Sequence, residues 1–104
     1  MQSEVLKGSV DVLLLSVLRT GEAHGYRIVE LVREQSEGAF DLAEGTVYPA
    51  LYRLERAGEL ASRWETVGGR RRRVYRLTRR GRRELVRRRR EWEAYSRAMG
   101  AALA

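Results

Sequence analysis

Cysteine is absent from this 104-residue sequence, and histidine and proline occur once each, as His24 and Pro49. Without cysteine the chain has no disulfide, no thiol nucleophile and no thiolate ligand for a metal. A single histidine also argues against a histidine-based metal cluster. We therefore expect no catalytic residues, no cofactor and no metal site, and an enzyme is the function class that this composition supports least.

Long hydrophobic runs are missing as well. The most apolar segment, residues 10–18, is too short to span a bilayer and is interrupted by Asp11. No small-residue cleavage site follows it, which argues against a signal peptide. We expect a cytoplasmic protein without a membrane partner. With 43% hydrophobic and 34% charged residues, the chain is typical of one globular domain.

Positive charge is distributed unevenly. Residues 1–69 contain 7 Lys and Arg against 11 Asp and Glu, a net charge of −4, whereas residues 70–104 contain 14 Arg against 3 Glu, a net charge of +11. This asymmetry favours a polyanionic partner for the basic part. Nucleic acid is one such partner, and an acidic membrane surface is the competing one.

Residues 43–58 predict the helix around which the chain is organised. Its apolar side recurs at helical spacing and consists of Val47, Leu51 and Leu54. Thr46 can cap the N-terminus, which would place Pro49 in the first turn, and Gly58 then ends the helix. The opposite side is aromatic and cationic, and carries Thr46, Tyr52, Arg53 and Arg56, with Tyr48 at its edge.

A β-hairpin is predicted after this helix. Residues 60–67 alternate in polarity, Gly68-Gly69 favours a reversal, and residues 74–78 form the return strand. A two-stranded hairpin is marginal alone, so Trp64, Tyr75 and Leu77 should pack on the helices. Its turn continues into Arg70, Arg71, Arg72 and Arg73. With another helix at about residues 24–36, a cationic helix and a cationic hairpin tip predict a winged helix-turn-helix on DNA.

Two further helices are expected at the ends of the chain. Residues 5–18 form a helix with spare apolar surface at Val5, Val12 and Leu15. Thr78 can cap a last helix that runs to about Ala98. The stripe of this last helix has no later element to cover it, and consists of Leu85, Trp92, Tyr95 and Met99. Pairing both surfaces across a twofold axis predicts a homodimer, in which Trp92 serves purely as a dimer anchor or also lines a cavity for a flat hydrophobic effector.

The expected fold class is therefore mainly α with a small β-hairpin. We expect a winged helix-turn-helix DNA-binding domain at residues 1–78 and a C-terminal dimerisation helix at residues 79–104.

Taken together, these patterns resemble the PadR family of transcriptional regulators. The matching segments are residues 12–18, His24-Gly25-Tyr26, residues 45–51, Arg53-Leu54-Glu55, Gly58, residues 69–72, residues 74–78 and Gly81. The resemblance covers roughly residues 5–86, and the remaining single helix matches the short-tailed branch of the family. Glu44 departs from the family pattern, in which a Ser-Pro pair is common, and the arginine density of the tail departs as well.

The family resemblance implies a cytoplasmic homodimer that usually represses transcription at a pseudo-palindromic operator. It also implies that a small hydrophobic effector sometimes releases the DNA. The residues that we assign to double-stranded DNA are Thr46, Tyr48, Tyr52, Arg53, Arg56, Arg70, Arg71, Arg72 and Arg73, together with His24 and Tyr26 from the family motif. For His24 and Tyr26, capping and core packing are equally open roles.

Two other function classes share the basic tail. One is a nonspecific RNA- or ribosome-associated protein, which has no need for a helix-turn-helix at residues 45–54. The other is an adaptor whose basic face binds an acidic protein. Preference for double-stranded DNA over RNA separates the first from a regulator, and indifference to DNA at low salt would favour the second.

Overall fold

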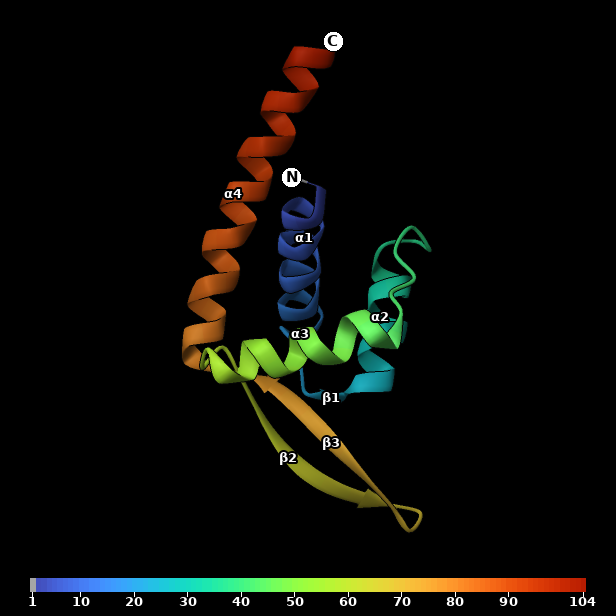
Figure 1. The fold of residues 1–104 in the computed structure, drawn as a ribbon. Coiled ribbons are helices and arrows are strands. Elements are labelled where there is room, and N and C mark those ends of the chain that lie inside the picture. Colours follow the sequence, from blue (N-terminus) through green and yellow to red (C-terminus); the bar gives the residue numbers. More distant parts are fainter. Residues whose placement is uncertain (1) are drawn as a thin grey trace.

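A computed structural model describes the backbone of residues 2–104 and the side chains from residue 8 onward. In order, the elements are α1 (Gln2–Val17), β1 (Ala23–His24), α2 (Gly25–Gln35), α3 (Glu44–Arg56), β2 (Leu60–Val67), β3 (Arg70–Leu77) and α4 (Arg79–Leu103). The β2–β3 hairpin extends from one side of the helices, and the last turns of α4 extend beyond α1 on the other (Figure 1). The predicted winged helix-turn-helix with a C-terminal helix is confirmed.

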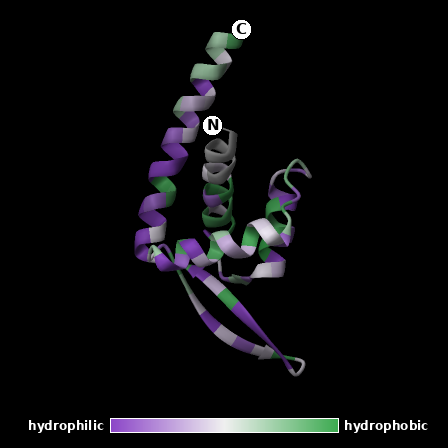
Figure 2. Ribbon diagram, viewed as in Figure 1, coloured by the Kyte–Doolittle hydropathy of each residue, from purple (hydrophilic) through white to green (hydrophobic). Residues whose placement is uncertain are grey.

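The core lies between the first three helices and the base of the hairpin. Its completely buried side chains are Leu14, Leu15, Leu18, Ile28, Val32, Val47, Leu51, Leu54 and Leu60. As predicted, Tyr75 and Leu77 also pack into it from β3. Figure 2 shows that α1 is mostly hydrophobic where it is described, whereas most of α4 is hydrophilic. None of the helices in the described part of the chain is long and apolar enough to cross a membrane.

The start of α3 differs from the prediction. The N-cap is Ala43, whose carbonyl accepts hydrogen bonds from the amides of Thr46 and Val47 at 2.9 and 3.0 Å. Thr46 therefore lies inside the first turn and is not the cap. Pro49 falls in the second turn, where its missing N–H cannot bond to the carbonyl four residues earlier. Glu44 in the first turn compensates in part, because a carboxylate is favourable at the positive end of a helix.

The sheet is larger than the sequence indicated. β1 pairs with β3, so the strand order is β1-β3-β2. In the hairpin, Val67 pairs with Arg70 across Gly68 and Gly69, which have φ of 57° and 79°. This two-residue turn needs positive φ at both positions, which glycine adopts without strain. The arginine run is therefore strand, not tip, and its side chains alternate between the two faces of β3.

Trp64 does not pack on the helices, contrary to prediction. It pairs with Arg73 in the outer half of the hairpin and is 54% exposed. Tyr75 and Leu77 lie nearer the base of the hairpin, where the helices cover them. The alternation predicted the correct face for Trp64 but could not tell how far the helices extend along it.

Two residues expected at a dimer interface belong to the core of the single chain. Leu15 is completely buried and Leu85 is 4% exposed, because the first turns of α4 pack against α1. Trp92, Tyr95 and Met99 remain exposed further along α4, and Val12 is partly buried. Val5 lies outside the residues whose side chains are described.

The start of α4 agrees with the prediction, although the helix continues to Leu103. The amide of Gly81 donates to the Thr78 hydroxyl at 3.0 Å, which confirms the cap. A Cβ at Gly81 would lie 2.0 Å from the carbonyl oxygen of Glu59. Only glycine therefore lets α4 approach the start of β2 this closely.

Candidate nucleic-acid interface

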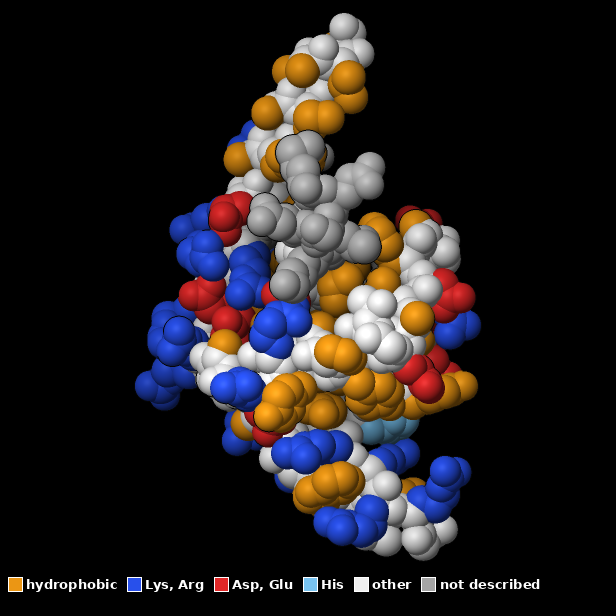
Figure 3. Space-filling view, in the orientation of Figure 1, with side chains coloured by type: hydrophobic (Ala, Val, Ile, Leu, Met, Phe, Trp, Pro, Cys, Tyr) orange, Lys and Arg blue, Asp and Glu red, His pale blue; other side chains and the backbone are white. Residues whose placement is uncertain are grey.

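An open groove of about 800 Å³ separates the N-terminal ends of α2 and α3 from the hairpin. Its walls bring together many of the residues assigned to DNA, namely His24, Tyr26, Tyr48, Arg70, Arg71, Arg72 and Arg73, and also include Trp64 and Glu44. The outer face of α3, with Tyr52 and Arg56, is also exposed. Figure 3 shows hydrophobic side chains gathered over α3 and cationic side chains along the hairpin beside it.

Two of the segments that carry the family resemblance, His24-Gly25-Tyr26 and residues 45–51, are in direct contact in this groove. A Cβ at Gly25 would lie 2.6 Å from the ring of Tyr48. The absence of a side chain at Gly25 therefore lets the tyrosine of the second motif pack against the start of α2. Burial raises the pKa of the Tyr48 phenol, and Glu44 raises it further. The hydroxyl consequently stays protonated and can donate a hydrogen bond at the edge of the groove.

His24 sits at the junction of β1 and α2. Its Nδ1 accepts a hydrogen bond from the amide of Arg27 at 3.3 Å, so the imidazole is the N-cap of α2. Burial lowers the pKa of His24, and the positive charge of Arg72 lowers it further. The capping role left open by the sequence is thus observed, next to an exposed Tyr26.

Acidification should weaken the fold through His24. Its folded-state pKa lies below the unfolded value near 6.5, so the unfolded chain binds the proton more readily. The stabilisation from the neutral cap is therefore complete above about pH 6.5 and is lost as the pH falls through the folded-state pKa. His24→Asn keeps a capping oxygen without the titration. Denaturant unfolding between pH 7.5 and 5 should show the larger loss of stability in the wild type, and parallel losses would contradict this role.

The exposed face of α3 is aromatic at its centre and cationic at its edges. Tyr52 is 62% exposed, and the guanidinium of Arg56 lies 5.7 Å from its ring centre. Thr46 is exposed on the same helix. Arg53 does not project freely as expected, because it donates to the carboxylate of Asp11 on α1. Its flank of α3 faces α1, so any contact with DNA must compete with this ion pair.

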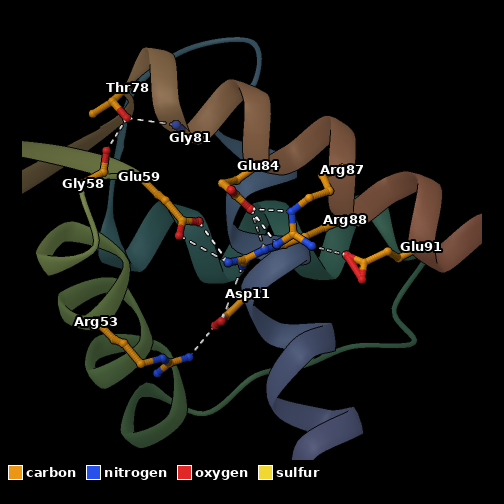
Figure 4. Close-up of polar contacts among 10 residues, drawn as sticks. All are labelled: Asp11, Arg53, Gly58, Glu59, Thr78, Gly81, Glu84, Arg87, Arg88 and Glu91. Atoms are coloured by element: carbon orange, nitrogen blue, oxygen red, sulfur yellow. Dashed lines mark hydrogen bonds and ion pairs between the residues drawn. The ribbon is translucent and has the colours of Figure 1, made fainter.

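Asp11 belongs to a cluster of ion pairs that joins α1, α3, α4 and the turn before β2 (Figure 4). Guanidinium nitrogens of Arg88 on α4 lie 3.6 Å from a carboxylate oxygen of Asp11 and 3.1 Å from one of Glu59. Glu59 is only 5% exposed. Burial raises the pKa of Glu59, and Arg88 opposes that shift. No sequence pattern indicated Glu59 or Arg88 as members of this cluster, and Asp11 stood out only as an interruption of an apolar segment. The cluster ties α4 to α3, so the position of one helix constrains the other.

The four consecutive arginines at the start of β3 are in unequal surroundings. Arg72 donates to Glu65 at 3.1 Å, and Arg73 lies 3.5 Å from Glu55 while donating to Ser62. Within the described residues, Arg70 and Arg71 form no ion pair, and neither does Arg76 nearer the base of the hairpin. Of the four consecutive arginines, Arg70 and Arg71 are therefore the ones whose charges are not compensated.

A second, apolar pocket of about 380 Å³ lies between α1 and α4. Val12, Leu13, Phe40 and Trp92 line it, with Ser9, Ser16, Arg89 and Glu93 at its rim. Trp92 stacks edge-on against Tyr95, with ring centres 5.5 Å apart. Among the described residues, no cluster of His, Asp or Glu has the composition of a metal site.

Comparison with known proteins places this architecture in one family. Residues 14–87 match the transcriptional regulator PadR-like family. A transcriptional regulator of Mycobacterium tuberculosis is 38% identical over 94 residues, which are 90% of this chain and 85% of that protein.

Solved structures agree with this assignment. A transcriptional regulator from Clostridium thermocellum superposes with a TM-score of 0.86 at 31% identity, over 94% of this chain and 96% of the other. Bacillus subtilis PadR in complex with operator DNA superposes with a TM-score of 0.69 at 28% identity, over 74% of this chain and 44% of the other. The chain belongs to the PadR-like family, whose members are transcriptional regulators and not enzymes.

Proposed function

We propose that the protein binds a pseudo-palindromic DNA operator as a homodimer and represses transcription in the cytoplasm. The observation that carries this proposal is the groove, in which the two family motifs contact each other opposite the arginines of the hairpin. The operator complex of Bacillus subtilis PadR, a structural neighbour, supports DNA as the ligand. A polyanion also balances the +11 charge of residues 70–104.

In this proposal, the two parts of the interface have different roles. The exposed face of α3, with Thr46, Tyr52 and Arg56, enters the major groove, where side chains can distinguish base pairs. The hairpin arginines contact phosphates, which fixes the register without reading sequence. Tyr48 and Tyr26, at the edge of the groove, are placed to donate hydroxyl hydrogen bonds to the DNA backbone.

The proposed dimer uses the part of α4 that the chain itself leaves uncovered. Trp92, Tyr95 and Met99 form an exposed apolar stripe beyond the turns of α4 that pack on α1. An aromatic stripe of this kind favours association. A second copy covers the stripe and supplies a second α3, as a two-fold symmetric operator requires.

The pocket beside Trp92 is the proposed site of a small hydrophobic effector. Its lining combines Val12 and Leu13 of α1 with Phe40 and Trp92, so a flat apolar ligand there lies between α1 and α4. Arg88 on α4 contacts Asp11, and Asp11 contacts Arg53 on α3. A change in the angle of α4 therefore alters the ion pair that holds Arg53. Ligand binding that shifts α4 is therefore coupled to the orientation of the DNA-binding helix.

Capture of genomic fragments by the purified protein tests the function. One or a few fragments should be enriched, and the best should shift in a gel at nanomolar protein while an excess of RNA fails to displace it. RNA that competes as well as the fragment would favour the nonspecific RNA-binding alternative. Indifference to all DNA at low salt would favour the protein adaptor.

Arg53 provides a test of base reading. If it leaves Asp11 to contact a base, Arg53→Ala should cost about 1–3 kcal/mol on the operator and much less on random DNA of equal length. Asp11→Asn is the matched control, because it frees Arg53 while nearly preserving side-chain shape. Since Asp11 also contacts Arg88, the unfolding free energy of both variants is measured first. Equal losses of binding free energy on both DNAs would indicate that Arg53 contacts a phosphate and not a base.

A further inference from the structure

We propose that Trp64 is a DNA-contacting residue of the hairpin and that its indole orients the guanidinium of Arg71 toward a phosphate. This inference rests on the proposed DNA-binding function. It assigns a role to the large exposed side chain that the folding of the chain does not explain.

The surroundings of Trp64 are cationic and not apolar. The guanidinium carbons of Arg71 and Arg73 lie 4.5 and 5.2 Å from the centre of its ring. Despite these contacts Trp64 remains 54% exposed. Tyr75 and Leu77 on the same face of the hairpin are buried, so Trp64 is the large ring on this face that the helices leave open to a ligand.

The register of the hairpin shows which face carries Trp64 and the two arginines beside it. Trp64 pairs with Arg73 and Thr66 pairs with Arg71, so Trp64, Arg71 and Arg73 share one face. The same face continues through Ser62, whose hydroxyl donates to Glu55 of α3 at 2.6 Å. Trp64 also lines the groove with Tyr48 and the start of α2. A duplex bound against α3 therefore passes along the face of the hairpin that carries the indole.

The two stacked arginines differ in how else they are held. Arg73 donates to Ser62 and lies near Glu55, which fixes its guanidinium and offsets its charge. Arg71 has no ion pair among the described residues, and its guanidinium lies over the indole of Trp64. Stacking on an aromatic ring restricts a flexible cation while leaving its N–H groups available, so less entropy is lost when it meets a phosphate. Arg71 is thus the cation that depends on Trp64.

The positive charge around Trp64 favours nucleic acid as the ligand of this surface. Arg71 and Arg73 lie over the indole, and the groove that Trp64 lines also has Arg70, Arg72, Tyr48 and the start of α3 in its walls. An indole carries an N–H donor and an apolar surface, which suit the phosphate oxygens and deoxyribose rings of a backbone.

Fluorescence isolates Trp64, because the chain has only one other tryptophan, Trp92. In a Trp92→Phe variant, which keeps a ring at the proposed dimer contact and whose affinity for the duplexes is measured first, all indole emission comes from Trp64. Titration with the captured operator duplex, and with a random duplex of equal length, should change this emission and lower its quenching by acrylamide severalfold. The DNA-dependent change should disappear in the Trp64→Phe variant, in which only Trp92 emits.

Affinity measurements complete the test in the wild-type background. Trp64→Leu should lower affinity for both duplexes about fivefold, as expected for loss of a cation–π contact. It should also reduce the log–log salt slope by up to roughly 0.9, one phosphate contact. Trp64→Phe, which keeps a ring, should retain most of the affinity, and circular dichroism checks that each variant folds.

The outcomes separate the inference from the function on which it rests. If the protein binds the duplexes while Trp64 stays accessible to acrylamide and Trp64→Leu leaves affinity and slope unchanged, the role of Trp64 is overturned and DNA binding stands. If no duplex is bound at all, both are overturned.

Discussion

The Trp92→Ala variant is expected to sediment as a monomer at micromolar concentration and to bind the operator about a hundredfold more weakly than the wild type. Trp92 follows the buried first turns of α4 and is 37% exposed, and its ring packs against Tyr95. Truncating it removes the central aromatic of the proposed interface. Each monomer then binds one half-site alone, and the avidity of two linked half-sites, typically 10²–10⁴, is lost.

Val86→Ala is the matched control for this variant. Val86 is also an exposed apolar residue of α4, but it lies on a different side of the helix from Trp92 and Met99. It should remain dimeric. A Trp92→Ala variant that also stays dimeric would contradict the anchor role, and if it had lost the response to a hydrophobic ligand, Trp92 would serve as an effector contact instead.

The Arg70→Ala/Arg71→Ala double variant is expected to flatten the salt dependence of DNA binding by about 1.8 log–log units, or 0.9 for each lost phosphate contact. These two arginines form no ion pair among the described residues, so their full charge is available to DNA. At 0.1 M salt this corresponds to a loss of affinity on the order of 10–100-fold. Operator and random duplexes should lose affinity alike, because phosphate contacts do not read sequence.

The Arg72→Ala/Arg73→Ala pair is the control for charge on the same strand. Glu65 and Glu55 already balance these arginines in part, so their removal should change the slope less. An unchanged salt slope in the Arg70/Arg71 variant would show that the hairpin does not contact DNA through these arginines. Equal changes in both pairs would mean that the ion pairs break on binding.

The elements that follow local rules were predictable from the sequence. Val47, Leu51 and Leu54 recur at helical spacing, and Gly68-Gly69 specifies a tight hairpin. Both elements formed, although α3 begins before Thr46 and the return strand already begins at Arg70. The His-Gly-Tyr motif indicated roles for His24 and Tyr26 but none for Gly25. Its role depends on the contact with Tyr48, which comes from another helix.

The features that the sequence did not reveal depend on distant residues or on lengths. Arg53 and Asp11 are 42 residues apart, so no spacing rule indicates their ion pair. β1 has two residues, too few to show alternation. Leu85 looked like part of a continuous stripe with Trp92, but the stripe is divided because α1 covers only the first turns of α4.

Hydroxyl-radical footprinting of the captured operator tests the central claim, specific recognition of duplex DNA by two copies of α3 and the hairpin. We predict two symmetric protected segments whose centres lie about one helical turn, roughly 10–10.5 base pairs, or a multiple of it apart. The protection should persist in the presence of excess RNA. Uniform protection along the fragment, or protection that RNA abolishes, would contradict the account.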